Sequence, residues 1–201
     1  MISRAAARAG TGAIVAAAIL AVAGCGSSSP SSTQATTVSP NAPEVNPAGD
    51  IPDNQAYVAY RPPGTHFSVK VPEGWSQRST GGAVTFTDKL NSIRMEQTPA
   101  SDPLTVVGAR STVLPRLAKS VPGYRPGAVT VVSRPAGSAV RITYLATSKP
   151  DSVTGRTTTD AVERYVFFHQ GRRVVLTLSG PKGADNVDPW KLVSSSVRWT
   201  P

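Results

Sequence analysis

The side chains that most often carry out catalysis are scarce in this sequence. It contains one cysteine, Cys25, and two histidines, His66 and His169. Both histidines fall in expected turns, widely separated along the chain, which disfavours most nucleophile–base pairs and zinc sites. A serine–lysine or carboxylate-based enzyme stays open on these grounds. The sequence therefore shows no active site, and we expect the protein not to be an enzyme.

Acidic residues that could bind a cation gather in one place. Asp185, Asn186 and Asp188 are close in sequence, and Asp151 lies in another predicted loop. A calcium ion takes about six to eight oxygen ligands, more than this group offers. We interpret Asp188 as a helix cap and the others as residues of Asx turns, and we expect neither a metal nor a cofactor.

Residues 1–24 have the pattern of a secretory signal peptide. Arg4 and Arg8 supply positive charge without any acid, and an apolar run follows from Ala13 to Ala23. The run is shorter than the roughly 20 residues that a membrane-spanning helix needs. A basic start, a short apolar stretch and small residues at the end are typical of a signal that is removed after export.

The only cysteine stands directly after this segment. Val22-Ala23-Gly24-Cys25 resembles a bacterial lipobox, in which an aliphatic residue and two small residues precede the cysteine. The resemblance implies that the Cys25 thiol receives a diacylglyceryl group and that cleavage falls between Gly24 and Cys25. Two or more acyl chains anchor a protein durably, so we expect this one on the extracytoplasmic face of the cell membrane. The alternative is an ordinary signal peptide with a cysteine there by chance.

Residues 25–56 are predicted to be a disordered tether. They are rich in serine, threonine and proline, and contain three acidic residues, no basic residue and no aromatic one. Such a segment cannot bury enough apolar surface to offset the entropy of ordering it. As a coil it would span about 30 Å and hold residues 57–201 clear of the lipid headgroups. O-glycosylation of its hydroxyl groups is an alternative use.

The chain from Tyr57 onwards is strongly basic. It contains 19 lysine and arginine residues and 9 acidic ones, a formal charge of +10. An excess of this size can attract an anionic surface such as lipid headgroups or acidic wall polymers. It can equally reflect an arginine-rich composition with a merely solvated surface. We do not expect nucleic acid as a partner, because the domain is predicted to be exported.

Residues 57–201 are predicted to form one domain built mainly of strands. Phe67–Pro72 alternates apolar and polar residues and stops at a turn, and strands are also expected at 83–87 and 93–97. Their spacing is that of an antiparallel meander. The later predicted strands lie at 128–133, 140–144, 161–168 and 174–178, with a short hairpin turn at 169–172.

Two segments have helical periodicity instead. The first opens at Asp102-Pro103, with Asp102 as the expected cap, and Pro115 should kink it. The second opens in the same way at Asp188-Pro189. The apolar residues expected to face the sheet are Leu104, Val107, Leu114, Leu117 and Val121 in the first helix and Trp190, Val193 and Val197 in the second. Together the elements predict an α+β domain, an antiparallel sheet flanked by two helices.

Several segments of this domain resemble a known family. Phe67–Trp75 is similar to the opening of domains with the PsbP-like (Mog-type) fold, and residues 150–155, 162–165 and 183–190 are similar to LpqN/LpqT-type lipoproteins of actinobacteria. The resemblance covers about residues 57–200. It implies an α/β/α sandwich that is exported and lipid-anchored, with protein-binding roles in some members. It implies no catalytic residues.

The remaining candidates for an interaction surface are charged. Arg172 and Arg173 follow the hairpin turn and are either a solvated tip or a possible interaction face, and the neighbours Glu163 and Arg164, interpreted as a cross-strand surface charge pattern, are open to the same question. Trp75 is assigned to the edge of the core. We expect a monomeric, non-enzymatic binding or accessory module for an envelope polymer, lipid or protein. The alternative is a small hydrolase or a lipid-handling protein, for which a deep apolar pocket with converging polar groups would be the sign.

Overall fold

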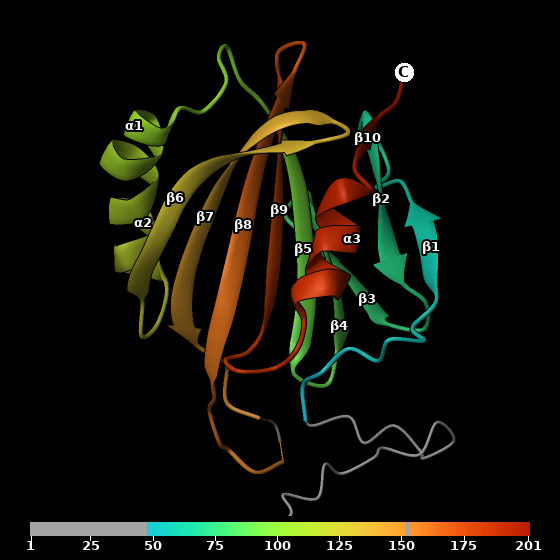
Figure 1. The fold of residues 1–201 in the computed structure, drawn as a ribbon, viewed down its shortest axis with the longest axis vertical. Coiled ribbons are helices and arrows are strands. Elements are labelled where there is room, and N and C mark those ends of the chain that lie inside the picture. The colour runs from blue at the N-terminus through green and yellow to red at the C-terminus, as the bar shows by residue number, and fades with distance from the viewer. Residues whose placement is uncertain (1–47, 152) are drawn as a thin grey trace, which may run out of the picture. The chain divides into compact units, whose positions relative to one another are not determined.

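Two antiparallel sheets form most of the computed structural model, which describes residues 48–151 and 153–201 (Figure 1). The large sheet has the order β3-β4-β5-β9-β8-β7-β6, and the small sheet has the order β1-β2-β10. The strands of the large sheet are β3 (Ser76–Thr80), β4 (Ala83–Asp88), β5 (Asn91–Pro99), β6 (Arg125–Arg134), β7 (Gly137–Thr147), β8 (Thr159–His169) and β9 (Arg172–Pro181). Those of the small sheet are β1 (Tyr57–Tyr60), β2 (Phe67–Pro72) and β10 (Arg198–Trp199).

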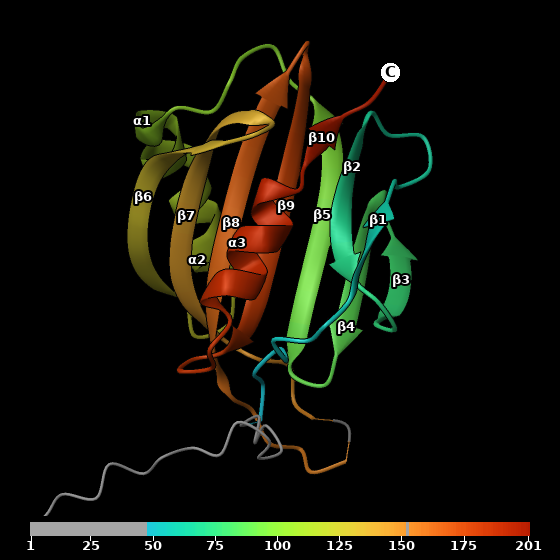
Figure 2. The ribbon, with the colours of Figure 1, turned by 45° about the vertical axis from the view of Figure 1, so that its right-hand side comes forward.

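Two helical regions lie on opposite faces of the large sheet (Figures 1 and 2). The first consists of α1 (Val106–Gly108), the π-helix η1 (Ala109–Val113) and α2 (Leu114–Ser120). The second is α3 (Val187–Ser195), which shares its side of the large sheet with the small sheet. An α+β domain with an antiparallel sheet flanked by two helices is thereby confirmed.

The predicted export signals cannot be placed in this fold. The predicted signal peptide, the junction at Gly24 and Cys25, and residues 25–47 of the predicted tether lie outside the described residues. Within the part of the chain that the structure describes, no helix is long and apolar enough to cross a bilayer.

The main core lies between the large sheet, α3 and β2. Alternate residues of β9, Val174, Leu176 and Leu178, are all buried in it, as period-two alternation requires. Val193 and Val197, at and just after the end of α3, are almost fully buried beside them, and Trp190 is 8% exposed, so the predicted docking face of the last helix is confirmed. Trp75 also belongs to this core.

The predicted antiparallel meander is present, but one of its three predicted strands belongs to the small sheet. Phe67–Pro72 pairs with β1 and β10 in the small sheet, and the meander is formed by β3, β4 and β5. Strand β3 has the sequence SQRST and is exposed throughout, so alternation of apolar residues could not reveal it. Gly81 and Gly82, both at positive φ, form the tight turn from β3 to β4.

The first helix begins later than its proline predicts. Thr105, rather than Asp102, is the N-cap, and its side-chain oxygen accepts a hydrogen bond from the Gly108 amide at 3.0 Å. Val107 is consequently exposed instead of buried. The wider turns of η1 come just before Pro115, which lacks an N–H and would clash with the carbonyl four residues earlier in an α-helix.

The last helix also differs at its start. Asp188 lies in the first turn of α3, where its charge suits the helix dipole, and the N-cap position belongs to Asn186. The Asn186 side chain makes no capping bond because it is used elsewhere. The capping role predicted for Asp188 and the Asx turn predicted for Asn186 are therefore wrong.

A buried amide network ties the N-terminal end of the described chain to the domain. The side chain of Asn186 accepts a hydrogen bond from the Ile51 amide (2.8 Å) and donates to the carbonyl of Gly49 (2.9 Å) and to Asn91 Oδ1 (3.0 Å). Asn91 donates to the same Gly49 carbonyl at 2.8 Å. At Gly180 a Cβ atom would lie 2.2 Å from Asn91 Oδ1, so only glycine leaves room for the network.

Because of this network, the folded domain begins earlier in the chain than the predicted boundary at Tyr57. Ile51 is 4% exposed and belongs to the main core, although composition assigned it to the tether. Composition could not predict this burial, because one isoleucine among prolines and acids shows no periodicity. Its burial depends on Asn186, which is distant in sequence. The packed domain thus includes residues before Tyr57.

We predict that Asn186→Ala destabilises the domain by about 1–3 kcal/mol, because it leaves buried donors and acceptors without partners. The free energy of unfolding in urea, followed by tryptophan fluorescence, measures this loss. Asn54→Ala removes an exposed amide from the same N-terminal segment and should change stability by less than about 0.5 kcal/mol. Equal stability of the two variants would contradict the role assigned to the network.

Candidate anion-binding site

The face of the large sheet opposite α3 is divided into an apolar and a polar half. Over β6, β7 and part of β8, apolar side chains pack under the helices in a second core that includes Ala109, Leu117 and Ile142. Over β5 and β9 the side chains on the same face are mostly charged or polar, with Val175 as a buried apolar exception. At the boundary between the halves, charged side chains lie next to an apolar wall formed by the helices.

A cavity of about 410 Å³ lies at this boundary, between α2 and the sheet. We call it the arginine groove. Its charged side chains are Arg94, Arg116, Arg164, Arg173 and Glu96, and its apolar ones are Leu104, Val113, Leu117, Val166 and Val175. Four guanidinium groups and one carboxylate thus line the same cavity, which makes the groove a candidate site for anions.

Strand alternation and strand order bring these charges together. Arg94 and Glu96 stand two residues apart on β5, so they share a face. Arg164 comes from β8 and reaches Glu96 across β9, which lies between the two strands. Arg116 reaches the groove from α2, on the opposite wall.

Glu96 is held by two arginines. Its Oε2 accepts a hydrogen bond from Arg94 Nη2 at 2.8 Å, and Arg164 Nη2 lies 3.5 Å from its Oε1. Burial raises the pKa of Glu96, but the hydrogen bonds and charges of Arg94 and then Arg164 outweigh it and hold the pKa below its usual value. Glu96 is therefore an ionised structural partner, unsuited to accepting a proton near neutral pH.

Arg164 is an enclosed cation of the groove. Its side chain is 21% exposed, and burial lowers its pKa despite the opposing charge of Glu96. Its Nη1 donates to Thr177 Oγ1 at 3.1 Å. Among the described residues, Nε of Arg164 and Nε of Arg173 are buried without a hydrogen-bond partner. The groove thus holds more buried positive charge and more donors than the protein itself pairs.

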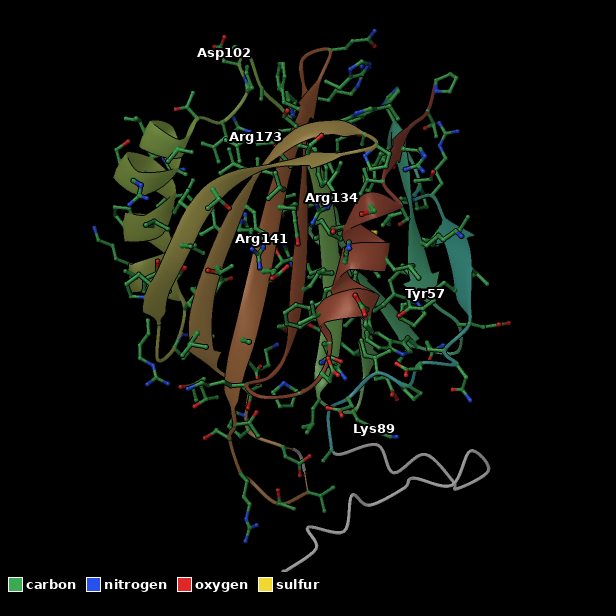
Figure 3. All side chains as sticks on the ribbon, in the orientation of Figure 1. Tyr57, Lys89, Asp102, Arg134, Arg141 and Arg173 are labelled. Atoms are coloured by element: carbon green, nitrogen blue, oxygen red, sulfur yellow. The ribbon has the colours of Figure 1, made fainter. Side chains whose placement is uncertain are left out.

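Arg172 and Arg173, predicted as an interaction face, point to opposite sides of the sheet. The two-residue turn before them is confirmed, with Gln170 and Gly171 both at positive φ. Arg173 lines the groove, and its Nη2 donates to the Asp102 carbonyl at 3.2 Å (Figure 3). Arg172 turns to the other side, where its Nη2 lies 3.5 Å from His66 Nε2. The structure therefore does not bring the pair together on one surface.

Glu163 and Arg164, predicted as a surface charge pattern, are separated in the same way. Glu163 lies on the α3 side, bonded to Arg141 and to the Tyr165 hydroxyl. Arg134, labelled with Arg141 in Figure 3, extends this network by donating to Ser194 Oγ of α3 at 3.0 Å. Consecutive residues of a strand face opposite ways, so only Arg164 belongs to the groove.

The two histidines share one cavity at the end of the sheet. His66 and His169 line a space of about 240 Å³ with Arg172 and Trp199, and the His169 ring stacks on Trp199 at 5.1 Å between ring centres. Neither a thiol nor a carboxylate side chain stands among its lining residues. The structure thus brings together histidines that the sequence keeps far apart, without completing a nucleophile–base set.

No model of a known protein family matches the sequence, and no curated protein matches it. Solved structures do resemble it. Cyanobacterial PsbP from Synechocystis sp. PCC 6803 is 15% identical, with a TM-score of 0.50 over 72% of this chain and 93% of that one. The Saccharomyces cerevisiae Ran-binding protein Mog1p is 10% identical, with a TM-score of 0.50 over 72% and 96% of the two chains. The chain has a PsbP-like fold.

A third structure is similar at a lower score. LpqN from Mycobacterium tuberculosis, involved in cell envelope biogenesis, is 17% identical, with a TM-score of 0.44 over 73% of this chain and 91% of that one. At such identities the likeness concerns the fold. The chemistry of the arginine groove rests on the residues of this chain alone.

The remaining candidates for chemistry on this PsbP-like fold are loop acids and a serine–lysine pair. Asp151 Oδ1 accepts bonds from the amides of Val153 and Thr154, which confirms its Asx turn. In residues 48–151 and 153–201, no three His, Cys, Asp or Glu side chains are grouped to hold a metal ion. Ser179 and Lys182 have the spacing of a serine–lysine pair, but Ser179 is bonded to Ser92 within the sheet and Lys182 lies past the end of β9.

We predict that Glu96→Gln makes the free energy of unfolding less sensitive to acid. Because the folded-state pKa of Glu96 is depressed, its ionised form stabilises the fold above the unfolded pKa, and this contribution is lost as pH falls through the folded pKa. Glutamine has no such contribution to lose. Urea unfolding at pH 6 and pH 3 should therefore show a smaller drop in the variant than in the wild type.

Glu73→Gln removes an exposed acid outside the groove and is the matched control. It should keep the drop of the wild type. The pairing of Glu96 with the arginines would be refuted by equal drops in both variants.

Proposed function

We propose that this protein is a non-enzymatic binding module of the LpqN/LpqT lipoprotein type, held on the outer face of the cell membrane by lipid on Cys25. It binds anionic groups of an envelope component in the arginine groove. The lipobox-like junction and the export signal support the placement, and the three segments at 150–155, 162–165 and 183–190 support the family.

The observation that carries the binding role is the charge of the groove. Four arginines surround a cavity of about 410 Å³ and have one carboxylate between them. Pockets for small ligands typically measure about 300–1,000 Å³. A guanidinium group is planar and can bind phosphate or carboxylate oxygens with two parallel hydrogen bonds. The groove therefore has both the size and the donors for an anionic group.

The enclosed part of this charge responds to salt differently from an ordinary basic surface. Exposed charges are screened by salt, whereas enclosed ones are screened much less. Arg164 is enclosed and only partly compensated by Glu96 at 3.5 Å. An anion that entered the groove would supply the missing countercharge and accept bonds from the guanidinium nitrogens that reach the cavity.

The groove lacks the pair of carboxyl groups that a carboxylate-based enzyme would need. A carboxylate-based glycosidase needs two carboxyl groups, one of them with a raised pKa. The groove has one, Glu96, whose pKa is lowered. The apolar wall, with Leu117 and Val166, keeps lipid handling as the second candidate, in which an anionic headgroup would lie on the arginines.

We predict that Arg164→Gln weakens binding of tripolyphosphate by about tenfold or more, the size of one charge-assisted hydrogen bond. Isothermal titration of the full chain in neutral detergent measures the affinity, and thermal unfolding shows that the variant is folded. Arg116→Gln, on the exposed side of the groove, should give a smaller loss in the same direction.

Arg156→Gln, in an exposed loop outside the groove, is the control for charge alone. It should change the affinity by less than about twofold, as expected for an exposed charge. Equal losses in Arg164→Gln and Arg156→Gln would refute the groove as the site. A single-chain anionic lipid that binds far more tightly than tripolyphosphate would favour lipid handling instead.

We predict that Cys25→Ala releases the protein into the medium, because the acyl chains that hold it would have no attachment point. Cell fractionation followed by a carbonate wash measures the membrane-bound fraction. Ser28→Ala, three residues along the same segment, should stay with the membrane. Cys25→Ala protein that remains membrane-bound after the wash would show the lipid anchor to be wrong.

A further inference from the structure

A line of alternating arginine and threonine side chains crosses five strands of the large sheet. Arg78 stands opposite Thr85, and Thr85 stands opposite Arg94. Arg94 in turn stands opposite Thr177, and Thr177 opposite Arg164. Directly opposed residues of antiparallel strands point to the same face. We call these five residues the Arg–Thr ladder.

The ladder runs from the edge of the sheet into the arginine groove. Arg78 is exposed on β3, the edge strand, while Arg94 and Arg164 line the groove itself. Neighbouring strands lie about 4.8 Å apart, so the strands carrying successive arginines are separated by about 10 Å. The groove adds Arg116 from α2 and Arg173, which lies further along β9 from Thr177. Positive charge thus forms a track much longer than one small anion.

Every ladder position carries a hydrogen-bond donor and none carries an acid. Arginine offers donors only, and a threonine hydroxyl donates readily to a charged oxygen. The nearby Glu96 is already held by Arg94 and Arg164. A surface of this kind complements a ligand whose polar atoms are mainly charged acceptors repeated along its length.

We infer that the ligand of the groove is a linear polymer with repeated phosphate groups, which lies along the Arg–Thr ladder and ends beneath α2. This inference rests on the proposed function and specifies its ligand. A flexible chain satisfies both ends of the track at once, because it can lie on the exposed strands and also enter the groove. Each phosphate that pairs with an arginine releases counterions, so a longer chain binds more tightly and with a steeper salt dependence.

Other anionic partners fit the track less well. A planar bilayer cannot reach Arg164, 21% exposed between α2 and the sheet, while it contacts Arg78 on the edge. Single-stranded nucleic acid is bound largely by aromatic stacking, and no ladder position is aromatic. An extended acidic peptide needs pockets for alternate side chains, whereas a row of arginine and threonine heads supplies only donors.

The test compares a short and a long polyanion on the full chain in neutral detergent. Titrations use tripolyphosphate and long-chain polyphosphate, at several salt concentrations, with wild-type protein and three variants. Arg78→Gln alters the far end of the ladder, Arg164→Gln alters the groove, and Arg156→Gln alters an exposed loop. Arg78 is exposed on an edge strand, so its substitution leaves the fold intact.

The wild type should bind long-chain polyphosphate at least about tenfold more tightly than tripolyphosphate, since additional phosphates reach the ladder. Arg78→Gln should weaken the long chain by about three- to tenfold, reduce its salt slope by about 1, and leave tripolyphosphate unchanged. Arg164→Gln should weaken both ligands, and Arg156→Gln neither.

The binding site and the identity of its ligand are tested separately by these variants. If Arg78→Gln binds long-chain polyphosphate as the wild type does while Arg164→Gln weakens both ligands, the ladder inference is overturned and the groove survives. If Arg164→Gln weakens neither, the proposed function fails. Equal losses of long-chain polyphosphate affinity in Arg78→Gln and Arg156→Gln would overturn the ladder inference, because net charge alone would then explain the effect. Vesicles of phosphatidylglycerol that bind with an Arg78-dependence that polyphosphate lacks would also overturn the inference, in favour of a membrane surface.

Discussion

The guanidinium group of Arg164 lies between the large sheet and α2 with too little opposite charge nearby. Other charged side chains on the sheet face opposite α3 are grouped around it. Its partners are Glu96 at 3.5 Å and the hydroxyl of Thr177 at 3.1 Å. Burying a charge is costly unless it is paired and hydrogen-bonded. The protein bears this cost where Arg94, Arg116 and Arg173 surround the same cavity, so that the enclosed positive charge is a feature of the site and not of one side chain.

The fold tolerates this enclosed charge because the residues that stabilise the domain and those that line the groove lie on opposite faces of the large sheet. On the α3 side, β2, β5, β8 and β9 contribute a continuous apolar core, reinforced by the amide network of Asn186 and Asn91. The opposite face needs to be apolar only where α1, η1 and α2 cover it. Because the side chains of a strand alternate, one sheet can hold a closed core on one face and a cationic track on the other.

Local pattern predicted most strands, the last helix and the fold class, because each depends on residues close in sequence. It missed β1, β3 and β10, of which β3 has no apolar residue, and it assigned Ile51 to the tether, since its burial depends on Asn186. The groove was harder to foresee. Glu96 and Arg164 are 68 positions apart and meet only because β9 lies between β5 and β8. Adjacency in sequence suggested Arg172 with Arg173, which the strand sends to opposite faces.

Binding in the arginine groove requires that anions enter it and contact its guanidinium groups. The most direct test is to follow the Nε–Hε resonances of the arginines by NMR during titration with tripolyphosphate, assigned by single arginine-to-lysine substitutions. We expect shifts for Arg164, Arg94 and Arg173, and unchanged resonances for Arg134 and Arg141 on the α3 side. Shifts spread evenly over exposed arginines, with Arg164 unmoved, would contradict anion binding in the groove.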